Sequence, residues 1–478
     1  MSDKAQTIIN GDPSLYNEDL APIPKSNRTW GTFEIFNVWA NDIQSLFGYT
    51  LAAGLFVSYG LNGWVVFSAL MLAGIIMMWL CNLVGKPSVE YGIPFPVMAR
   101  SSMGIRGANF PAVIRGFVAV FWFGAQTYFA SAAVALLLYS TTGGSREAIF
   151  LGMSEIDWVA FIIVWAFQMW LFIQGMNFIG KFLNWAGPFV YLVMIALVGV
   201  LWYQAGSGFL GEVGTIFSGV GEYDGSNFGA FMAIVGTMIS YFAAVVINYG
   251  DFSRFVKTEK EMKRGNLWGL PANIAFFSLI TLLMTGGAAV VFGEIMTDPT
   301  MMIERVNNTT LTVIAALMFF AATVGINLVA NFVPVAYNLV NLAPEKINFR
   351  LGGIITSIIG FVIGAFWVST ISQIGIFGFV NTLGAILAPV FGIMIADYYL
   401  LKGGKLNLQD LYSVDPSGEY FYDKGWNKKA IIAFVVSSIF SVATVWVPAL
   451  SVLGGFAWII GAGLGAVSYY VIMPKMSR

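Results

Sequence analysis

Histidine is absent from this sequence of 478 residues, and cysteine occurs once, at Cys81 in an apolar run. Without histidine the chain lacks the commonest metal ligand and the only side chain whose ordinary pKa lies near neutrality. A single cysteine excludes a disulfide within the chain and any cysteine-cluster metal site. Because no nucleophile motif stands in for these residues, we expect neither an enzyme nor a resident cofactor. Proton chemistry, if it occurs, must use carboxylates.

Charge is scarce as well. Charged residues make up 10% of the chain, against about 25% in ordinary soluble domains. Apolar residues make up 58% and recur in runs of the roughly 20 residues that a membrane-spanning helix requires. The composition therefore predicts an all-α polytopic membrane protein whose partners are the lipid bilayer and a small molecule. Nothing in it points to nucleic acid, and we expect a monomer.

Twelve apolar runs are long enough to span a bilayer. They cover residues 31–58, 62–84, 109–139, 157–175, 180–204, 228–249, 267–294, 310–340, 351–369, 372–401, 429–447 and 450–473. If the N-terminus is cytoplasmic, only Arg146 and Arg305 of the 24 basic residues fall in outer loops, which is the asymmetry of the positive-inside rule. We therefore expect twelve spans in the cell membrane, with both termini cytoplasmic.

The first span is unusually polar. Residues 37–49 carry two Asn, an Asp, a Gln, a Ser and a Gly, although an unpaired polar group in hydrocarbon costs several kcal/mol. This pattern predicts a broken helix that lines a substrate site. Asp42 is the only carboxylate well inside this span, and an intramembrane carboxylate indicates an ion or proton site, with a structural hydrogen-bond partner as the alternative.

The sixth span lies five spans after the first and is also polar at mid-depth, where residues 236–244 include Gly236, Thr237, Ser240 and Tyr241. Transporters often contain two repeats of opposite topology with discontinuous helices in matching places. The spacing predicts a five-plus-five inverted repeat followed by two extra helices. Ordinary close packing of small residues between membrane helices is the alternative explanation.

Two further spans carry polar pairs four residues apart, which places each pair on one helix face. In the third span Trp122 and Gln126 offer an aromatic surface beside an amide, which suits a flat ring with hydrogen-bonding edges. In the eighth span the pair is Asn327 and Asn331. The alternatives are a core tryptophan and amides that bond neighbouring helices.

Three features near the predicted cytoplasmic ends of the spans have structural interpretations. Asp251 and Arg254 are three residues apart, which favours a local ion pair or a helix-end anchor. Asp397 is expected to anchor a helix end in the same way. The segment 91–100 contains Pro94 and Pro96 but is too apolar for a solvated loop, so we expect it to pack under the bundle.

Five stretches in the same order resemble the nucleobase-cation-symport-1 family. They are Gly104-Ile105-Arg106-Gly107, Trp122-Phe123-Gly124-Ala125-Gln126, Asn248-Tyr249-Gly250-Asp251-Phe252-Ser253-Arg254, Pro344-Glu345-Lys346-Ile347-Asn348-Phe349-Arg350 and Ala396-Asp397-Tyr398-Tyr399. The resemblance covers nearly the whole chain. It implies the fold of the five-plus-five inverted-repeat sodium symporters, and a substrate among nucleobases, hydantoins, allantoin and related compounds.

The resemblance also implies particular site residues. In its hydantoin-transporting members the substrate is held by residues that match Trp122, Gln126, Phe242 and Asn331. Phe242 departs from the family's frequent Trp, which keeps a stacking ring but removes an N–H donor. Gln44 matches a polar contact of the first span, and Val380 matches a gate residue of the tenth.

The cation site implied by the resemblance is incomplete here. Its expected backbone oxygens belong to Ala40, Ile43 and Ala322, but the two positions that should supply hydroxyls read Gly325 and Ile326. Hard cations prefer oxygen ligands, and Thr323 is only a displaced substitute. The coupling ion is thus sodium or a proton, and the missing hydroxyls favour a proton carried by Asp42.

The sequence as a whole predicts a secondary active importer of a nucleobase-like heterocycle such as uracil, allantoin or a hydantoin. Residues 1–29 form a tail, 30–402 the ten-helix transport core, 403–428 a cytoplasmic loop and 429–478 two peripheral helices with a short tail. A proton-coupled permease for an amino acid or a vitamin is the alternative. A channel fits least, because the polar groups cluster at mid-depth and form no continuous path or ring of charge.

Overall fold

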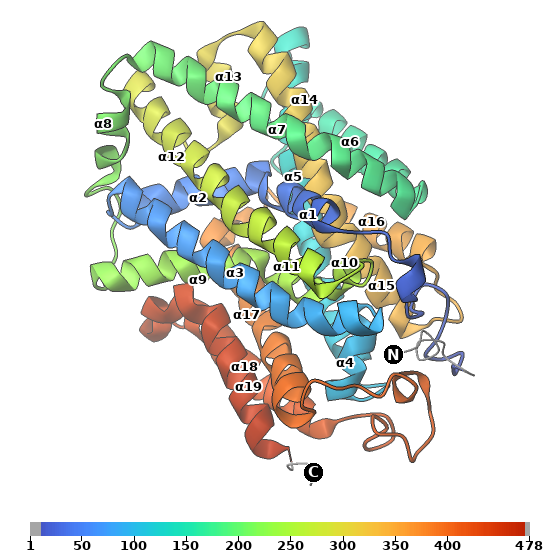
Figure 1. Ribbon diagram of the computed structural model, residues 1–478. Helices are drawn as coiled ribbons and strands as arrows, with labels where there is room; N and C mark the ends of the chain where they lie inside the picture. The colour runs from blue at the N-terminus through green and yellow to red at the C-terminus, as the bar shows by residue number, and fades with distance from the viewer. Residues whose placement is uncertain (1–10, 474–478) are drawn as a thin grey trace.

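The computed structural model describes residues 11–473, except for the side chains of residues 176–177, 180, 183, 185 and 187–190. Helices make up most of this range, and within it no strand forms beyond isolated single-residue bridges. The all-α prediction is therefore confirmed. Figure 1 shows α13 and α14 at one end of the molecule, and α4 with residues 403–428 at the other.

Helices occupy every range that the sequence assigned to a span. Their bounds are α1 Thr32–Ile43, α2 Leu46–Ser58, α3 Gly63–Tyr91, α4 Phe95–Met103, α5 Asn109–Thr142, α6 Glu155–Ile173, α7 Met176–Ala205, α8 Phe209–Val213, α9 Asn227–Asn248, α10 Gly250–Ser253, α11 Glu259–Leu267, α12 Asn273–Phe292, α13 Pro299–Val306, α14 Thr309–Ile326, α15 Val333–Leu342, α16 Phe349–Ala365, α17 Ile376–Ile395, α18 Lys428–Trp446 and α19 Ala457–Ile472. Wider π-helical turns, η4 Trp268–Ala272, η5 Asn327–Phe332 and η7 Ala396–Leu401, continue α11, α14 and α17.

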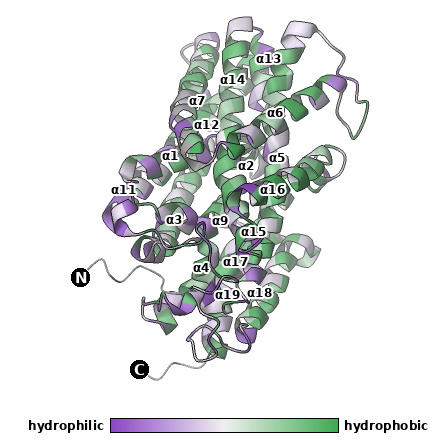
Figure 2. Ribbon diagram, turned by 90° about the vertical axis from the view of Figure 1, so that its right-hand side faces the viewer, coloured by the Kyte–Doolittle hydropathy of each residue, from purple (hydrophilic) through white to green (hydrophobic). Residues whose placement is uncertain are grey.

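The outward faces of the helices are apolar. On α18, for example, Ile432, Val436 and Ile439 are each more than half exposed, and Figure 2 shows hydrophobic ribbon over most of the bundle. Such a surface suits lipid rather than water. Within the described residues nine helices are long and apolar enough to cross a membrane, or ten if the bent pair Tyr191–Ala205 and Phe209–Phe217 is one span.

The first predicted span is broken at its polar stretch, as expected. α1 ends at Ile43 and α2 begins at Leu46. Ser45 caps α2, because its Oγ accepts a hydrogen bond from Gly48 N at 2.9 Å. Thr323 Oγ1, from α14, accepts a second one from Leu46 N at 3.2 Å. Side chains of this span and of α14 thus satisfy backbone groups that the break releases.

The sixth predicted span, in contrast, is unbroken, since α9 runs continuously from Asn227 to Asn248. Its small residues allow close packing: a Cβ on Gly236 would lie 1.8 Å from the carbonyl oxygen of Gly455, and Ser240 packs directly against Gly384. Packing, the alternative explanation for these residues, therefore accounts for Gly236 and Ser240. α9 thus has no break at the position matching that of the first span.

The short helix α4 packs under the bundle, as expected for this apolar segment, and all nine of its residues are buried. Asp251, just after α9, accepts hydrogen bonds from Phe95 N at 2.8 Å and from Asn248 Nδ2 at 2.7 Å. Within the described chain Asp251 forms no ion pair with Arg254, which donates to the carbonyl of Asp19 instead. Asp251 is thus a helix-end anchor, one of the two structural roles expected for this pair.

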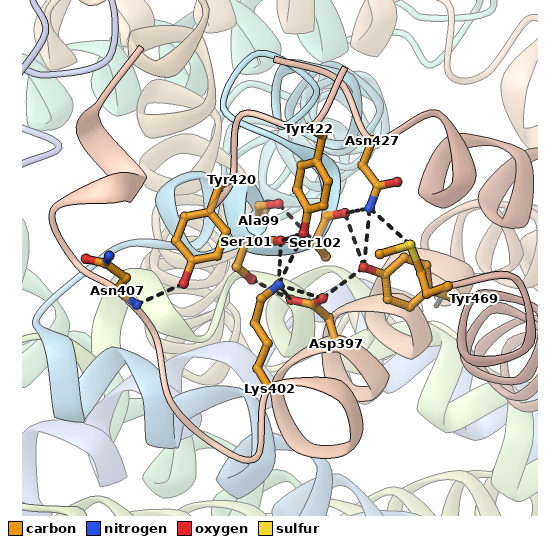
Figure 3. A network of polar contacts seen from close by, with 11 residues as sticks. Ala99, Ser101, Ser102, Asp397, Lys402, Asn407, Tyr420, Tyr422, Asn427 and Tyr469 are labelled. Carbon is orange, nitrogen blue, oxygen red and sulfur yellow. Dashed lines mark hydrogen bonds and ion pairs between the residues drawn. The ribbon is translucent and has the colours of Figure 1, made fainter. Parts of the chain in front are cut away.

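A buried polar network ties the other end of α4 to the C-terminal part of the chain (Figure 3). The Asp397 carboxylate pairs with Lys402 Nζ at 2.7 Å, and both side chains are almost fully buried. Ser101 of α4 donates to Asp397 at 2.8 Å, while Tyr469 of α19 donates to it at 2.8 Å. Asp397 is thus the helix-end anchor that was expected, and it joins α4, α17 and α19.

Candidate functional site

A cavity between α1, α5, α9 and the eighth predicted span brings together five residues that the sequence singled out. They are Asp42, Trp122, Gln126, Phe242 and Asn331, and the rest of the lining is Tyr241, Ala244, Val245, Ile326 and Ala330. The cavity volume is about 10 Å³, far below the roughly 300 Å³ of small-molecule pockets. The cavity is thus closed in this conformation, and its walls must move apart to admit a ring.

Trp122 is held in place by other aromatic rings. Its indole meets Phe47 at 4.9 Å, Phe379 at 5.0 Å and Tyr241 at 5.5 Å between ring centroids, with interplanar angles of 72–74°. These are the edge-to-face arrangements that aromatic quadrupoles prefer. Phe242 lies next to Tyr241, at a centroid distance of 4.8 Å. The aromatic wall is therefore packed against other rings on several sides.

Two polar atoms of the cavity residues are buried without an ordinary hydrogen bond to any described residue. They are Gln126 Oε1 and Asp42 Oδ2. Leaving such an acceptor unpaired in a protein interior costs about 1–3 kcal/mol, and more if it is charged. A ligand that donates hydrogen bonds to them would remove this cost. Both atoms are thus candidate contacts for a ligand or a proton.

The orientation of the Asn331 amide is fixed by its neighbours. Asn327 Nδ2 donates to the backbone oxygen of Phe123 at 3.2 Å and to Gln168 Oε1 at 2.6 Å. Because a backbone oxygen can only accept, Asn327 must turn its own Oδ1 toward Asn331, whose Nδ2 donates to it at 2.9 Å. Asn331 therefore has its carbonyl oxygen and one N–H left for the cavity.

Three of the predicted substrate residues do not line this cavity. Asn327 lies behind Asn331 and supports it. Gln44 accepts a hydrogen bond from Tyr49 across the break between α1 and α2. Val380 is fully buried in α17, and the neighbouring Phe379 is the residue that reaches Trp122.

The residues predicted for the cation are also buried, but their oxygen atoms are partly engaged. Thr323 Oγ1 accepts from Leu46 N, and the carbonyl of Ile43 accepts from Ser45 N at 3.1 Å. A Cβ on Gly325 would lie 2.6 Å from Asn41 Oδ1, so an amide occupies the space into which a side chain there would project. Ala40 and Ala322 are buried nearby in α1 and α14. These residues do not reproduce the two-hydroxyl cation site that the resemblance implies.

Sequence reasoning did not assign several aromatic residues of this region to the site. Tyr241, noted only as a polar residue at mid-depth, lines the cavity, and its hydroxyl lies 3.1 Å from Ser45 Oγ at the helix break. Phe47 stacks parallel to Tyr241 at 6.0 Å and also meets Trp122. The phenol of Tyr241 in an apolar span was a usable signal. Phe47 and Phe379 gave none, because phenylalanine is common throughout the chain.

Comparisons with known proteins agree with this architecture. A family model described as permease for cytosine/purines, uracil, thiamine and allantoin matches residues 22–471. The chain is 33% identical over 465 residues to the allantoin permease of Bacillus subtilis (strain 168), covering 96% of this chain and 93% of that protein. It is 31% identical over 481 residues to the purine-uracil permease of Arabidopsis thaliana, covering 98% of this chain and 79% of that one.

The fold is similar to that of solved transporters. Mhp1, a nucleobase-cation-symport-1 family transporter in a closed conformation with bromovinylhydantoin bound, superposes with a TM-score of 0.78 at 22% identity, covering 96% of this chain and 95% of that one. A Na⁺-coupled sialic acid symporter superposes with a TM-score of 0.68 at 11% identity, covering 96% and 92%. Together with the family match over residues 22–471, these findings place the chain in the nucleobase-cation-symport-1 family of permeases.

Proposed function

We propose that the protein is a secondary active importer that carries a nucleobase-like heterocycle across the cell membrane by cation-coupled alternating access. The observation that carries this proposal is the convergence of Trp122, Gln126 and Asn331 on one cavity. These residues come from two helices, and they offer an aromatic surface beside hydrogen-bonding edges. The names of the relatives, which include allantoin, uracil and purine permeases, support the same class of substrate.

The polar edges of the cavity favour a ligand rich in N–H donors. Asn331 offers a carbonyl oxygen, and Gln126 Oε1 and Asp42 Oδ2 are acceptors without partners. Uracil, hydantoins and allantoin carry ring N–H groups that match them. An amino acid also needs a partner for its carboxylate, and the described lining contains no Lys or Arg. The proposal therefore favours a neutral heterocycle over an amino acid.

For the membrane arrangement, we propose twelve spans in two five-helix repeats followed by α18 and α19, which pack against α17. The presence of helix in each of the twelve predicted ranges supports this count. The protein then acts as a monomer with both termini cytoplasmic.

For coupling, the observation that favours a proton is the carboxyl group of Asp42. It lines the same cavity as the substrate residues, and its Oδ2 has no hydrogen-bond partner in the described chain. Intramembrane carboxylates in transporters commonly serve as proton relays. Sodium is the alternative, supported by the fold shared with a Na⁺-coupled symporter, although Gly325 and Ile326 supply no hydroxyl.

Uptake of radiolabelled uracil, allantoin and hydantoin by cells that express single variants tests the substrate site. Trp122→Ala removes the aromatic wall and Gln126→Ala removes an edge contact, so we expect each to abolish uptake while the amount of protein in the membrane stays constant. Trp79→Ala is the matched control, because Trp79 is 59% exposed on α3, and it should keep normal uptake. Wild-type uptake by both cavity variants would contradict the assignment.

Proteoliposomes with imposed gradients test the coupling ion. We expect uptake to follow an inward proton gradient without sodium, because Asp42 is the coupling group. Asp42→Asn keeps the size of the side chain but cannot titrate, so it should lose gradient-driven uptake and retain exchange of internal for external substrate. Uptake that requires sodium and ignores the pH gradient would exclude the proton mechanism.

A further inference from the structure

Arg115 is a buried cation beneath the cavity that the proposed function does not use. It belongs to α5, seven residues before Trp122 on the side of α4, and its side chain is fully buried. Its Nε donates to the carbonyl oxygen of Ala244 at 3.2 Å, and its Nη2 donates to that of Ala330 at 2.6 Å. Nη1 has no hydrogen-bond partner in the described chain. No described carboxylate lies within ion-pair distance of this guanidinium.

The sequence explains why one of these carbonyls is available. Pro334 has no N–H, so it cannot make the usual helical hydrogen bond to the oxygen of Ala330, four residues earlier. The chain widens there into the π-helical segment η5, as is frequent at functional sites. Arg115 supplies a charged donor to this oxygen. The proline, the π-helix and the buried arginine thus form one local arrangement.

Both carbonyls belong to residues of the cavity lining, and they come from different elements. Ala244 lies on α9 and Ala330 on η5. α5 packs along α14, η5 and α15 but has few contacts with α9. The bond from Arg115 to Ala244 therefore links two helices that otherwise touch little. A gap between α9 and η5 at this level would open the cavity toward α4.

We propose that Arg115 is the latch that closes the cavity toward the α4 side, and that opening on this side breaks its bond to Ala244 while its bond to Ala330 persists. Alternating access needs such a reversible contact between elements that move apart. A hydrogen bond from a charged donor contributes enough free energy to change a two-state equilibrium by about tenfold or more.

When the latch opens, the buried guanidinium has other charged groups near it. The carboxylates of Asp42 and Asp251 both attract it electrostatically, although neither is bonded to it in this conformation. A buried charge left with no partner would cost several kcal/mol. Nearby carboxylates reduce that cost, so the latch can release without unfolding. Arg115 is thus a positioning residue that acts through α9 and η5 rather than through the ligand.

Access of a reporter cysteine to thiol reagents tests the latch. Cys81 is first replaced by Ser, and Val245→Cys places a thiol on the cavity wall. Membrane vesicles of known orientation are then treated with a membrane-impermeant maleimide. We expect Arg115→Gln to speed modification from the α4 side about tenfold, and Arg115→Lys to give an intermediate rate, because an ammonium keeps the charge but cannot hold both oxygens through separate nitrogens.

The matched control is Arg100→Gln. Arg100 is equally buried on α4, but it donates to Leu411 and Asn341 and makes no bond to α9, so this variant should leave the rate unchanged. An unchanged rate in Arg115→Gln would overturn the latch, as would faster modification from both sides alike. If Arg115→Gln does not reach the membrane, Arg115→Lys is used instead, and an unchanged rate of modification from the α4 side in that variant would overturn the latch.

This inference rests on the proposed transport function, but the two can fail separately. Thiol modification is measured without substrate. Faster modification in Arg115→Gln, together with no uptake of any heterocycle by the wild type, would leave the latch standing and reject the proposed substrate. Uptake by the wild type, together with an unchanged rate of modification in Arg115→Gln, would support the proposed substrate and reject the latch.

Discussion

Asn331 lines the cavity, and a second amide, Asn327, holds its nitrogen by accepting one hydrogen bond from it. The four-residue spacing predicted that the two side chains share a helix face, but it could not tell which of them reaches the ligand. That distinction depends on Phe123 and Gln168, which lie on other helices and accept the hydrogen bonds of Asn327. Gln44 illustrates the same limit, since its partner Tyr49 lies beyond the break between α1 and α2.

Replacing Asn327 should therefore weaken substrate binding although Asn327 does not line the cavity. In Asn327→Ala the Asn331 amide loses its fixed orientation, and we expect KM for uptake to rise about tenfold with little change in maximal rate. Asn338→Ala is the control, because both polar atoms of that buried amide lack partners in the described chain, so no hydrogen bond is lost. Equal KM values in both variants would argue against this support role.

At the scale of elements, the broken first span was predictable and the continuous sixth span was not. Both carry polar residues. Asp42 and Gln44 are too polar to serve only for close packing between helices, whereas Gly236 and Ser240 are small and fit against neighbouring helices. Glycine and serine look the same in a sequence whether they break a helix at a site or allow two helices to pack closely. The tenth span shows a related limit: Val380 and Phe379 differ by about 100° around the helix, and only the second reaches Trp122.

The anchor between α10 and α4 should respond to pH. Burial raises the pKa of Asp251 to about 6, although hydrogen bonds from Asn248 and from Phe95 N stabilise the carboxylate. The folded state then holds this proton up to a higher pH than the unfolded state does, so the contribution of Asp251 to stability falls as pH rises from about 4 to 6.

Asp251→Asn has no carboxyl group to titrate, and its altered hydrogen bonding is the same at every pH. We therefore expect Tm of this variant minus that of the wild type to increase between pH 4 and pH 7, by the equivalent of roughly 2 kcal/mol. Thermal unfolding of the purified proteins in detergent provides the measurement. A difference that is constant over this range, or that decreases, would rule out this role of the Asp251 carboxyl.

At the scale of the whole molecule, the apolar runs predicted where the helices lie, because burial of the backbone in lipid leaves helix as the only common solution for such runs. The cavity residues were found through the family resemblance and through polar side chains in spans. The partners of Arg115 were not, since they are backbone oxygens whose position depends on a proline and on how α9 packs. Contacts made by backbone atoms leave little trace in a sequence.

The number and direction of the spans lead to the last prediction. Arg146, near the end of α5, pairs with Glu304 of α13 at 2.6 Å, whereas residues 403–428 lie with α4 at the opposite end of the molecule (Figure 1). The positive-inside rule predicts that the α4 end is cytoplasmic. In a Cys81→Ser background, we expect a membrane-impermeant maleimide to label Ser145→Cys in intact cells and Ser417→Cys only after permeabilisation, since both positions are exposed. Labelling of both positions in intact cells would contradict twelve spans. Labelling of Ser417→Cys alone in intact cells would show that the orientation is the opposite one.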